Sequence, residues 1–107
     1  MHWERYIKDF VSYLKIEKGL AQNSILAYQR DVRLLADYFS LTKNKPEQVS
    51  YEELKTFIAH LYDLGLSARS QARIISGIKQ FFKYLILERY IQTDPSELLE
   101  QPKLGRK

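Results

Sequence analysis

Residues 67–85 read SARSQARIISGIKQFFKYL, and this stretch decides the fold. Its apolar residues recur every three or four positions, which is the spacing of one face of an α-helix. On a helical wheel of about 100° per residue, Ile75, Ile78 and Phe82 gather on one side. The stretch therefore predicts a long amphipathic helix over 68–88, whose apolar side faces the core of the protein.

The opposite side of this predicted helix is polar and basic. Residues 67–89 hold five basic residues and one acidic residue, a net charge of +4 that equals the charge of the whole chain. Arginine bonds guanine or phosphate, and neutral polar side chains bond phosphates and bases as well. Ser67 is a good N-cap, and the small side chains after it leave the helix N-terminus open to an anion. We call this side the basic front, and it consists of Arg69, Arg73, Ser76, Gln80 and Lys83.

Three further amphipathic helices are expected before this one, over 2–18, 23–40 and 51–64. A polar loop is expected over 43–49, and Asp94-Pro95 can open a short final turn. The chain shows no strand-type alternation and no internal repeat. Four helices joined by short loops predict an all-α protein, a compact four-helix bundle. Its core is expected to contain Ile7, Phe10, Leu14, Val32, Leu35, Phe57, Leu61, Ile75, Ile78 and Phe82.

Several residues mark the ends of these helices. Ser50 begins a capping box with the glutamate three residues later. Gly19 and Gly65 stand where a helix commonly ends in a left-handed residue. Asn23 or Gln22 is expected to begin the second helix, with asparagine as a strong N-cap.

The composition excludes several classes of site. The 107 residues include no cysteine, so disulfides and cysteine zinc sites are excluded. The two histidines have no metal-binding spacing, and there is no glycine-rich phosphate loop. No apolar run approaches the ~20 residues of a membrane span, and the N-terminus has no signal-peptide layout. We therefore expect a cytoplasmic protein without membrane contact, cofactor or catalytic site.

Four stretches together resemble one protein family. Residues 19–32, GLAQNSILAYQRDV, resemble the opening of that family's second helix, with Ser24 where threonine is commonest. Residues 66–85 are similar to its fourth helix. Asp94-Pro95-Ser96 is typical of the region after it, and Pro102-Lys103-Leu104 resembles the start of an interdomain linker. The family is the tyrosine recombinases of the Xer and phage-integrase type, and the resemblance is to their N-terminal core-binding (SAM-like) domain.

The resemblance implies a domain that clamps one face of duplex DNA, opposite a separate catalytic domain that carries the nucleophilic tyrosine. Residues 1–100 would be the DNA-binding domain, and 101–107 a linker toward that absent catalytic domain. The parent would be a site-specific recombinase or integrase that acts with other protomers on DNA. By position, the family's major-groove contacts fall on Asn23, Ser24, Tyr28 and Arg30 in the second helix, and on Arg69, Ser70, Arg73, Gly77 and Lys79 in the fourth.

Arg69 and Arg73 rank first among these residues, because the wheel also places them on the basic front. We expect both to be exposed, to lie beside the N-terminus of the second helix, and to contribute little to stability. Tyr28 falls on an expected core stripe as well as in the family pattern. Two alternatives stay open: a helical protein-interaction module, and a helix-turn-helix regulator that places only its fourth helix in the groove.

Overall fold

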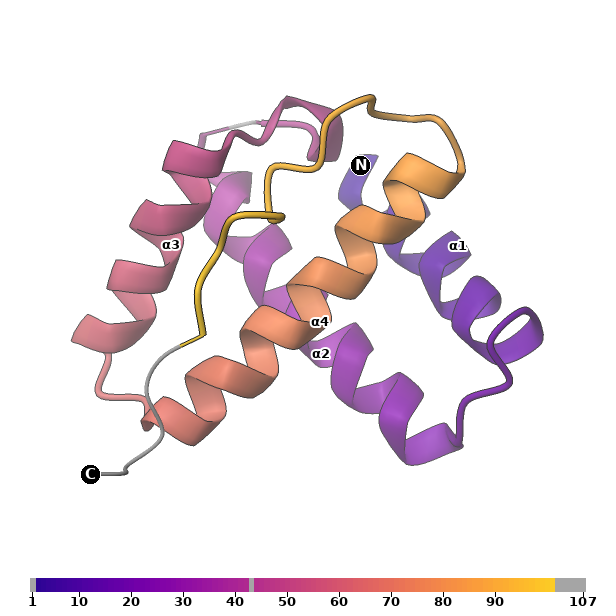
Figure 1. Ribbon diagram of the computed structural model, residues 1–107, viewed down its shortest axis with the longest axis horizontal. Helices are drawn as coiled ribbons and strands as arrows, with labels where there is room; N and C mark the ends of the chain where they lie inside the picture. Colours follow the sequence, from indigo (N-terminus) through magenta and orange to yellow (C-terminus); the bar gives the residue numbers. More distant parts are fainter. Residues whose placement is uncertain (1, 43, 102–107) are drawn as a thin grey trace.

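A computed structural model describes residues 2–42 and 44–101 and is all-helical over both ranges. The predicted all-α class with four helices is therefore confirmed (Figure 1). A short 3₁₀ turn, η1, lies in the loop before the third helix. The elements in chain order are α1 (His2–Ile16), α2 (Gln22–Ser40), η1 (Pro46–Gln48), α3 (Tyr51–Asp63) and α4 (Ala68–Leu87).

The two longest helices, α2 and α4, cross each other and form the main packing contact of the fold. Figure 1 shows α4 passing in front of α2, with α1 on one side of this crossing and α3 on the other. Both α2 and α4 begin at the lower edge of that view, at opposite sides of the molecule. Their first halves therefore diverge from the crossing.

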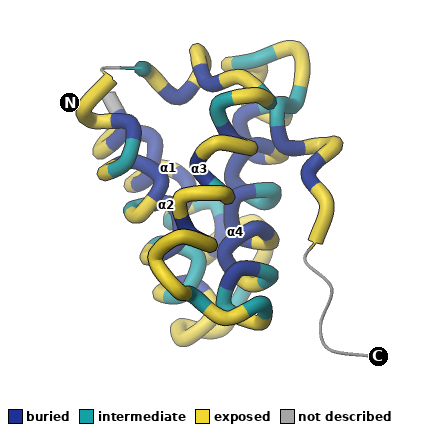
Figure 2. Tube along the Cα trace, turned by 90° about the vertical axis from the view of Figure 1, so that its left-hand side faces the viewer, coloured by how far each residue is buried: buried dark blue, intermediate teal, exposed yellow. Residues whose placement is uncertain are grey.

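The core lies where these helices meet. All ten residues predicted for the core are buried, and each exposes at most 1% of its surface. Figure 2 shows buried positions recurring along α4, while the connecting turns are largely exposed. Trp3 stacks on Phe39 and Phe81, with ring centroids 6.2 and 6.0 Å apart, and its indole N–H donates to the Asn44 carbonyl at 2.7 Å. The wheel thus assigned the apolar side of α4 correctly.

The predicted helix ends agree with the structure except at two sites. The Ser50 capping box is present, since its Oγ accepts from the Glu53 N–H at 3.1 Å. Gly19 and Gly65 have φ values of 62° and 87°. The asparagine cap was wrong, because α2 begins at Gln22 after Ala21, which makes no side-chain cap. The chain turns at Gly19 and then enters α2. In this turn the Leu20 N–H donates to the Leu14 carbonyl of α1.

The second difference is the 3₁₀ turn η1, which lies within the loop expected over 43–49. Its Pro46 is buried, so apolar contact holds this segment against the helices.

After α4 the chain reverses at Arg89, whose φ of 65° is left-handed. We call residues 90–101 the return segment, because they run back along α4 (Figure 1). The predicted turn at Asp94-Pro95 is present, and Asp94 Oδ1 accepts from the Ser96 N–H at 2.8 Å. Ser96 and Leu99 are buried, which fixes the segment to the domain. The linker predicted for 101–107 lies outside the described residues except for Gln101.

Candidate nucleic-acid interface

The first two turns of α4 carry two exposed arginines. Ser67 caps the helix, with its Oγ accepting from the Ser70 N–H at 3.1 Å. Arg69 and Arg73 follow one turn apart, and both are exposed as predicted. Among the described residues, Arg69 has no ion pair or side-chain hydrogen bond. This end of α4 therefore offers an open guanidinium beside a helix N-terminus.

Arg73 is anchored from below by a carboxylate of α2. Its Nη1 lies 2.7 Å from Oδ1 of Asp31, whose side chain is only 2% exposed, while that of Arg73 is 46% exposed. Asp31 lies in the middle of α2, so Arg73 does not lie beside that helix's N-terminus. Because Arg73 pairs with a buried carboxylate, we now predict that its removal lowers stability, contrary to the expectation from the sequence.

Gly77 explains how Asp31 reaches this position. A Cβ placed on Gly77 would lie 2.6 Å from Oδ2 of Asp31 and 2.9 Å from its Cβ. Any side chain at residue 77 would therefore collide with Asp31. Gly77 itself is buried in the crossing of α2 and α4, so its side-chain-free backbone serves helix packing.

The electrostatics of Asp31 follow from this burial. Removal from water raises the pKa of the Asp31 carboxyl above its usual value, while the nearby Arg73 and Arg30 oppose the rise. Oδ2 is buried and has no hydrogen-bond partner within the described residues. Arg73 is thus the one strong partner of a carboxylate that is otherwise poorly solvated.

The second half of the basic front has different surroundings. Lys79, Gln80 and Lys83 line a groove of about 380 Å³ together with the acidic Asp94 and Glu97 of the return segment. Gln101 at the end of that segment lies 3.5 Å from the Ser76 hydroxyl. Lys79, a predicted DNA contact, is half-buried here. Arg69 and Arg73 are not among the residues that line this groove, and we call these two arginines the open part of the basic front.

The predicted residues of α2 divide in the same way. Asn23 and Ser24 are exposed on the first turn, and Arg30 is exposed further along. Tyr28 is half-buried and packs against the core. The structure thus leaves polar and basic side chains outside on the first half of each crossing helix, and Ser70 adds a half-buried hydroxyl on α4.

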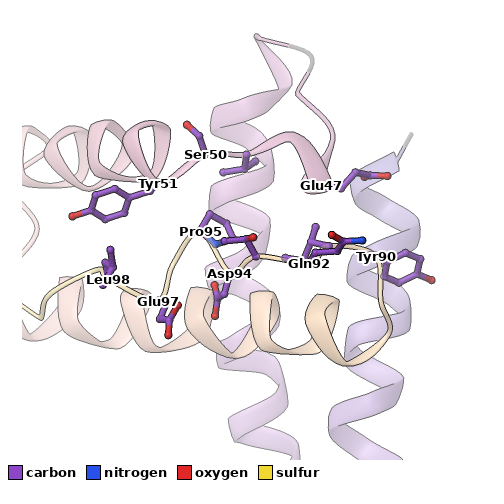
Figure 3. Close-up of a pocket in the computed structure, with 12 residues that line it drawn as sticks. Glu47, Ser50, Tyr51, Tyr90, Gln92, Asp94, Pro95, Glu97 and Leu98 are labelled. Atoms are coloured by element: carbon purple, nitrogen blue, oxygen red, sulfur yellow. The ribbon is translucent and has the colours of Figure 1, made fainter.

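A second groove lies elsewhere and has the opposite charge. This groove has a volume of about 600 Å³ and lies between the start of α3 and the return segment. Figure 3 shows Glu47, Glu97 and Asp94 around the groove. Within residues 2–42 and 44–101, no lysine or arginine lines this groove. A phosphate backbone would meet carboxylates there without a compensating cation from the described residues, so this groove does not suit nucleic acid.

Asp31 was the functional neighbour that sequence reasoning missed. It shares the apolar side of α2 with Val32 and Leu35, at the spacing of the core stripe. A charged residue on such a stripe is a signal of a buried ion pair, because an unpaired charge there is too costly. That signal was in the sequence, although the identity of its partner was not.

Comparison with known proteins supports the same assignment. Residues 7–89 match the family described as phage integrase, N-terminal SAM-like domain. The chain belongs to this family. It is 36% identical over 104 residues to tyrosine recombinase XerD of Staphylococcus epidermidis (strain ATCC 12228 / FDA PCI 1200). This alignment covers 94% of this chain and 35% of that protein. It is also 36% identical over 107 residues to tyrosine recombinase XerD of Staphylococcus aureus (strain N315), covering 97% and 36%.

This integrase-type domain thus spans about a third of the length of the curated relatives it matches. The family match contains α2, α3 and α4, and with them Asp31, Arg69 and Arg73. It ends at Arg89, so the return segment lies beyond it. Over the described residues, no helix is long and apolar enough to cross a membrane.

Proposed function

We propose that this chain is the DNA-binding domain of a site-specific tyrosine recombinase or integrase, which clamps duplex DNA with the first halves of α2 and α4. One observation carries the proposal. In a chain of the integrase N-terminal family, the open part of the basic front lies on the first turns of α4, outside the groove that Asp94 and Glu97 line. Exposed arginines at a helix N-terminus suit the phosphates and base edges of DNA.

The residues divide by position in this proposal. Arg69, Ser70 and Arg73 contact DNA from α4, and the other contacts come from α2. Tyr28 and Gly77 support these contacts through packing, since both lie at or in the core. Lys79 contributes long-range attraction from its groove. The contacts from α2 are those of Asn23, Ser24 and Arg30.

The chemistry of strand breakage and rejoining belongs to another part of the parent protein in this proposal. The chain itself binds duplex DNA, and a catalytic domain of the same parent closes the clamp from the opposite face. Other recombinase protomers occupy neighbouring sites on the DNA. We place this activity in the cytoplasm, and we assign the chain no cofactor.

Salt titration of DNA binding tests the proposal. Binding of a random-sequence duplex to the chain should weaken as salt rises, with a slope of about −0.9 for each phosphate neutralised. Arg69→Ala and Arg30→Ala should each flatten that slope by about one unit. Lys55→Ala is the matched control, because Lys55 is an exposed base on α3 that pairs with Glu52.

Other results of this titration would indicate a different function. Weak binding with a flat slope would overturn the proposal in favour of a protein-interaction module. Sensitivity to Arg69 but not to Arg30 would indicate a helix-turn-helix mode, in which α4 alone enters the groove.

A further inference from the structure

Asp31 is difficult to explain by stability alone. Its carboxylate is buried between α2 and α4, and Oδ2 has no hydrogen-bond partner among the described residues. Removing two charges from water is unfavourable, and replacing a buried ion pair with apolar residues of similar volume is often neutral or stabilising. An apolar side chain at residue 31 would join the core stripe around it. The carboxylate therefore calls for a role that an apolar residue cannot fill.

The geometry indicates that role. Oδ2 lies against the bare backbone at Gly77, and Oδ1 bonds the Arg73 guanidinium at 2.7 Å. Asp31 therefore holds one end of the guanidinium in a fixed place on the surface of α4. An arginine has five N–H donors, and 46% of this side chain remains exposed. The donors that Asp31 does not use are available to a ligand in front of α4.

The charge of the pair matters as much as its geometry. An ionised Asp31 cancels the charge of Arg73, so the pair offers a phosphate oriented donors but little net attraction. Arg69, which has no such partner within the described residues, keeps its whole charge. The two arginines, one turn apart, therefore differ in net charge and in how firmly each guanidinium is held. A fixed fork of donors suits the O6 and N7 acceptors of guanine, whereas a free guanidinium suits phosphate.

We propose that Asp31 is a positioning residue that holds Arg73 to read a guanine edge in the major groove, while Arg69 contacts the phosphate backbone. This inference rests on the proposed function, since it assigns separate tasks within the same interface. It makes Arg73 a determinant of sequence preference, and it explains why Gly77 and Asp31 meet beneath it.

The test compares preferred and random-sequence DNA. A duplex preferred by the chain is first selected from a pool randomised at its central base pairs, and each guanine in it is then replaced in turn. With Asp31→Asn, discrimination at one guanine should fall by about tenfold, the size of one specific contact. The same variant should bind random-sequence duplex more tightly, with a salt slope steeper by about one unit, because Arg73 regains its charge.

Two further variants separate positioning from a merely structural role. Asp37→Asn makes the same charge change at an exposed site on α2, so it should alter neither discrimination nor slope. Arg73→Lys keeps the charge that pairs with Asp31 but loses the planar fork. It should lose the guanine preference, and its thermal unfolding should match that of the unchanged chain.

The outcomes distinguish the two proposals. If the unchanged chain binds no duplex in a salt-dependent way, the proposed function fails and this inference fails with it. If the chain binds DNA but Asp31→Asn and Arg73→Lys keep the preference for guanine, only the inference is overturned. Thermal unfolding of each variant verifies that a lost preference is not lost folding. Should Asp31→Asn fail to fold, retained discrimination in Arg73→Lys still overturns the inference.

Discussion

The two halves of α4 present the same kinds of residue in different surroundings. In the first half, Arg69 and Arg73 stand open to solvent, and Arg73 is fixed by a buried carboxylate of α2. In the second half, Lys79 and Lys83 share a groove with the carboxylates of Asp94 and Glu97. The helical wheel places Arg69, Arg73 and Lys83 on one basic front. The packed structure divides that front into an open part and a part that faces an acidic segment.

This difference shows that the charge of a helix face is set by what packs around it. Acidic neighbours within a Debye length reduce the potential that a lysine presents to DNA, and the reach of this effect is about 8–10 Å at physiological salt. A buried carboxylate acts more locally, since it fixes one guanidinium in place. The front of α4 is therefore two surfaces rather than one.

The largest expected effect is a loss of unfolding free energy, and it should occur in both halves of α4. The apolar sides of the two halves are equally buried in the core. Phe82 in the second half and Ile75 in the first are both fully buried. Phe82→Ala should cost about 3–5 kcal/mol and Ile75→Ala about 2–5 kcal/mol of unfolding free energy, measured by urea denaturation. A loss below about 1 kcal/mol at either site would mean that the apolar side of that half of α4 is not part of the core.

The next effect should separate the halves. Arg73→Ala leaves the Asp31 carboxylate buried without its partner, so it should lower the unfolding free energy by about 3 kcal/mol. Lys83→Ala removes an exposed side chain and should change it by no more than about 0.5 kcal/mol. Equal small losses in urea denaturation would contradict the view that Asp31 depends on Arg73.

The pH dependence of stability should reveal Asp31 directly. Burial raises the pKa of Asp31 in the folded chain above the ordinary 3.8, so the folded state holds that proton more tightly than the unfolded state. This contribution to stability is present at low pH and is lost as pH rises from about 3.8 through the folded pKa, by at most about 1.4 kcal/mol per pH unit.

Asp31→Asn removes this contribution, and the remaining groups cancel when the two proteins are compared. The stability difference should therefore shift in favour of the asparagine variant as pH rises through that window. A difference that stays constant across the window would show that the carboxyl titrates alike in the folded and unfolded chains.

The smallest effect concerns DNA and compares the two ends of the basic front. Arg69→Ala should flatten the salt slope of duplex binding by about one unit, which is roughly fourfold in affinity between about 50 and 200 mM salt. Lys83→Ala should flatten it less, because Asp94 and Glu97 line the same groove. A larger effect of Lys83 would place the DNA over the second half of α4 and would require the return segment to move.

Much of the fold follows from local rules. The helices, their glycine ends and the Ser50 and Ser67 caps depend on residues within a few positions of each other, so periodicity and capping predict them. The start of α2 at Gln22 was one of the two expected, but the asparagine cap was wrong, because Ala21 precedes the helix and makes no side-chain cap. The 3₁₀ turn η1 has local support from Pro46 and from the Gln48 side chain, which accepts from the Lys45 N–H, but the burial of Pro46 depends on the rest of the domain.

The sequence by itself determined the family, the four helices and which side of α4 is apolar. The residues that decide the four helices and the apolar side of α4 act through the repeat of the helix, whereas the family follows from similarity over residues 7–89. The tertiary structure alone decided that Asp31 meets Arg73 across 42 positions of sequence, that Gly77 makes room for this contact, and that the return segment faces Lys79 and Lys83. The reason is that charge pairing and burial depend on distance in space. The crossing of α2 and α4 and the reversal at Arg89 set those distances, so a wheel drawn for one helix cannot show them.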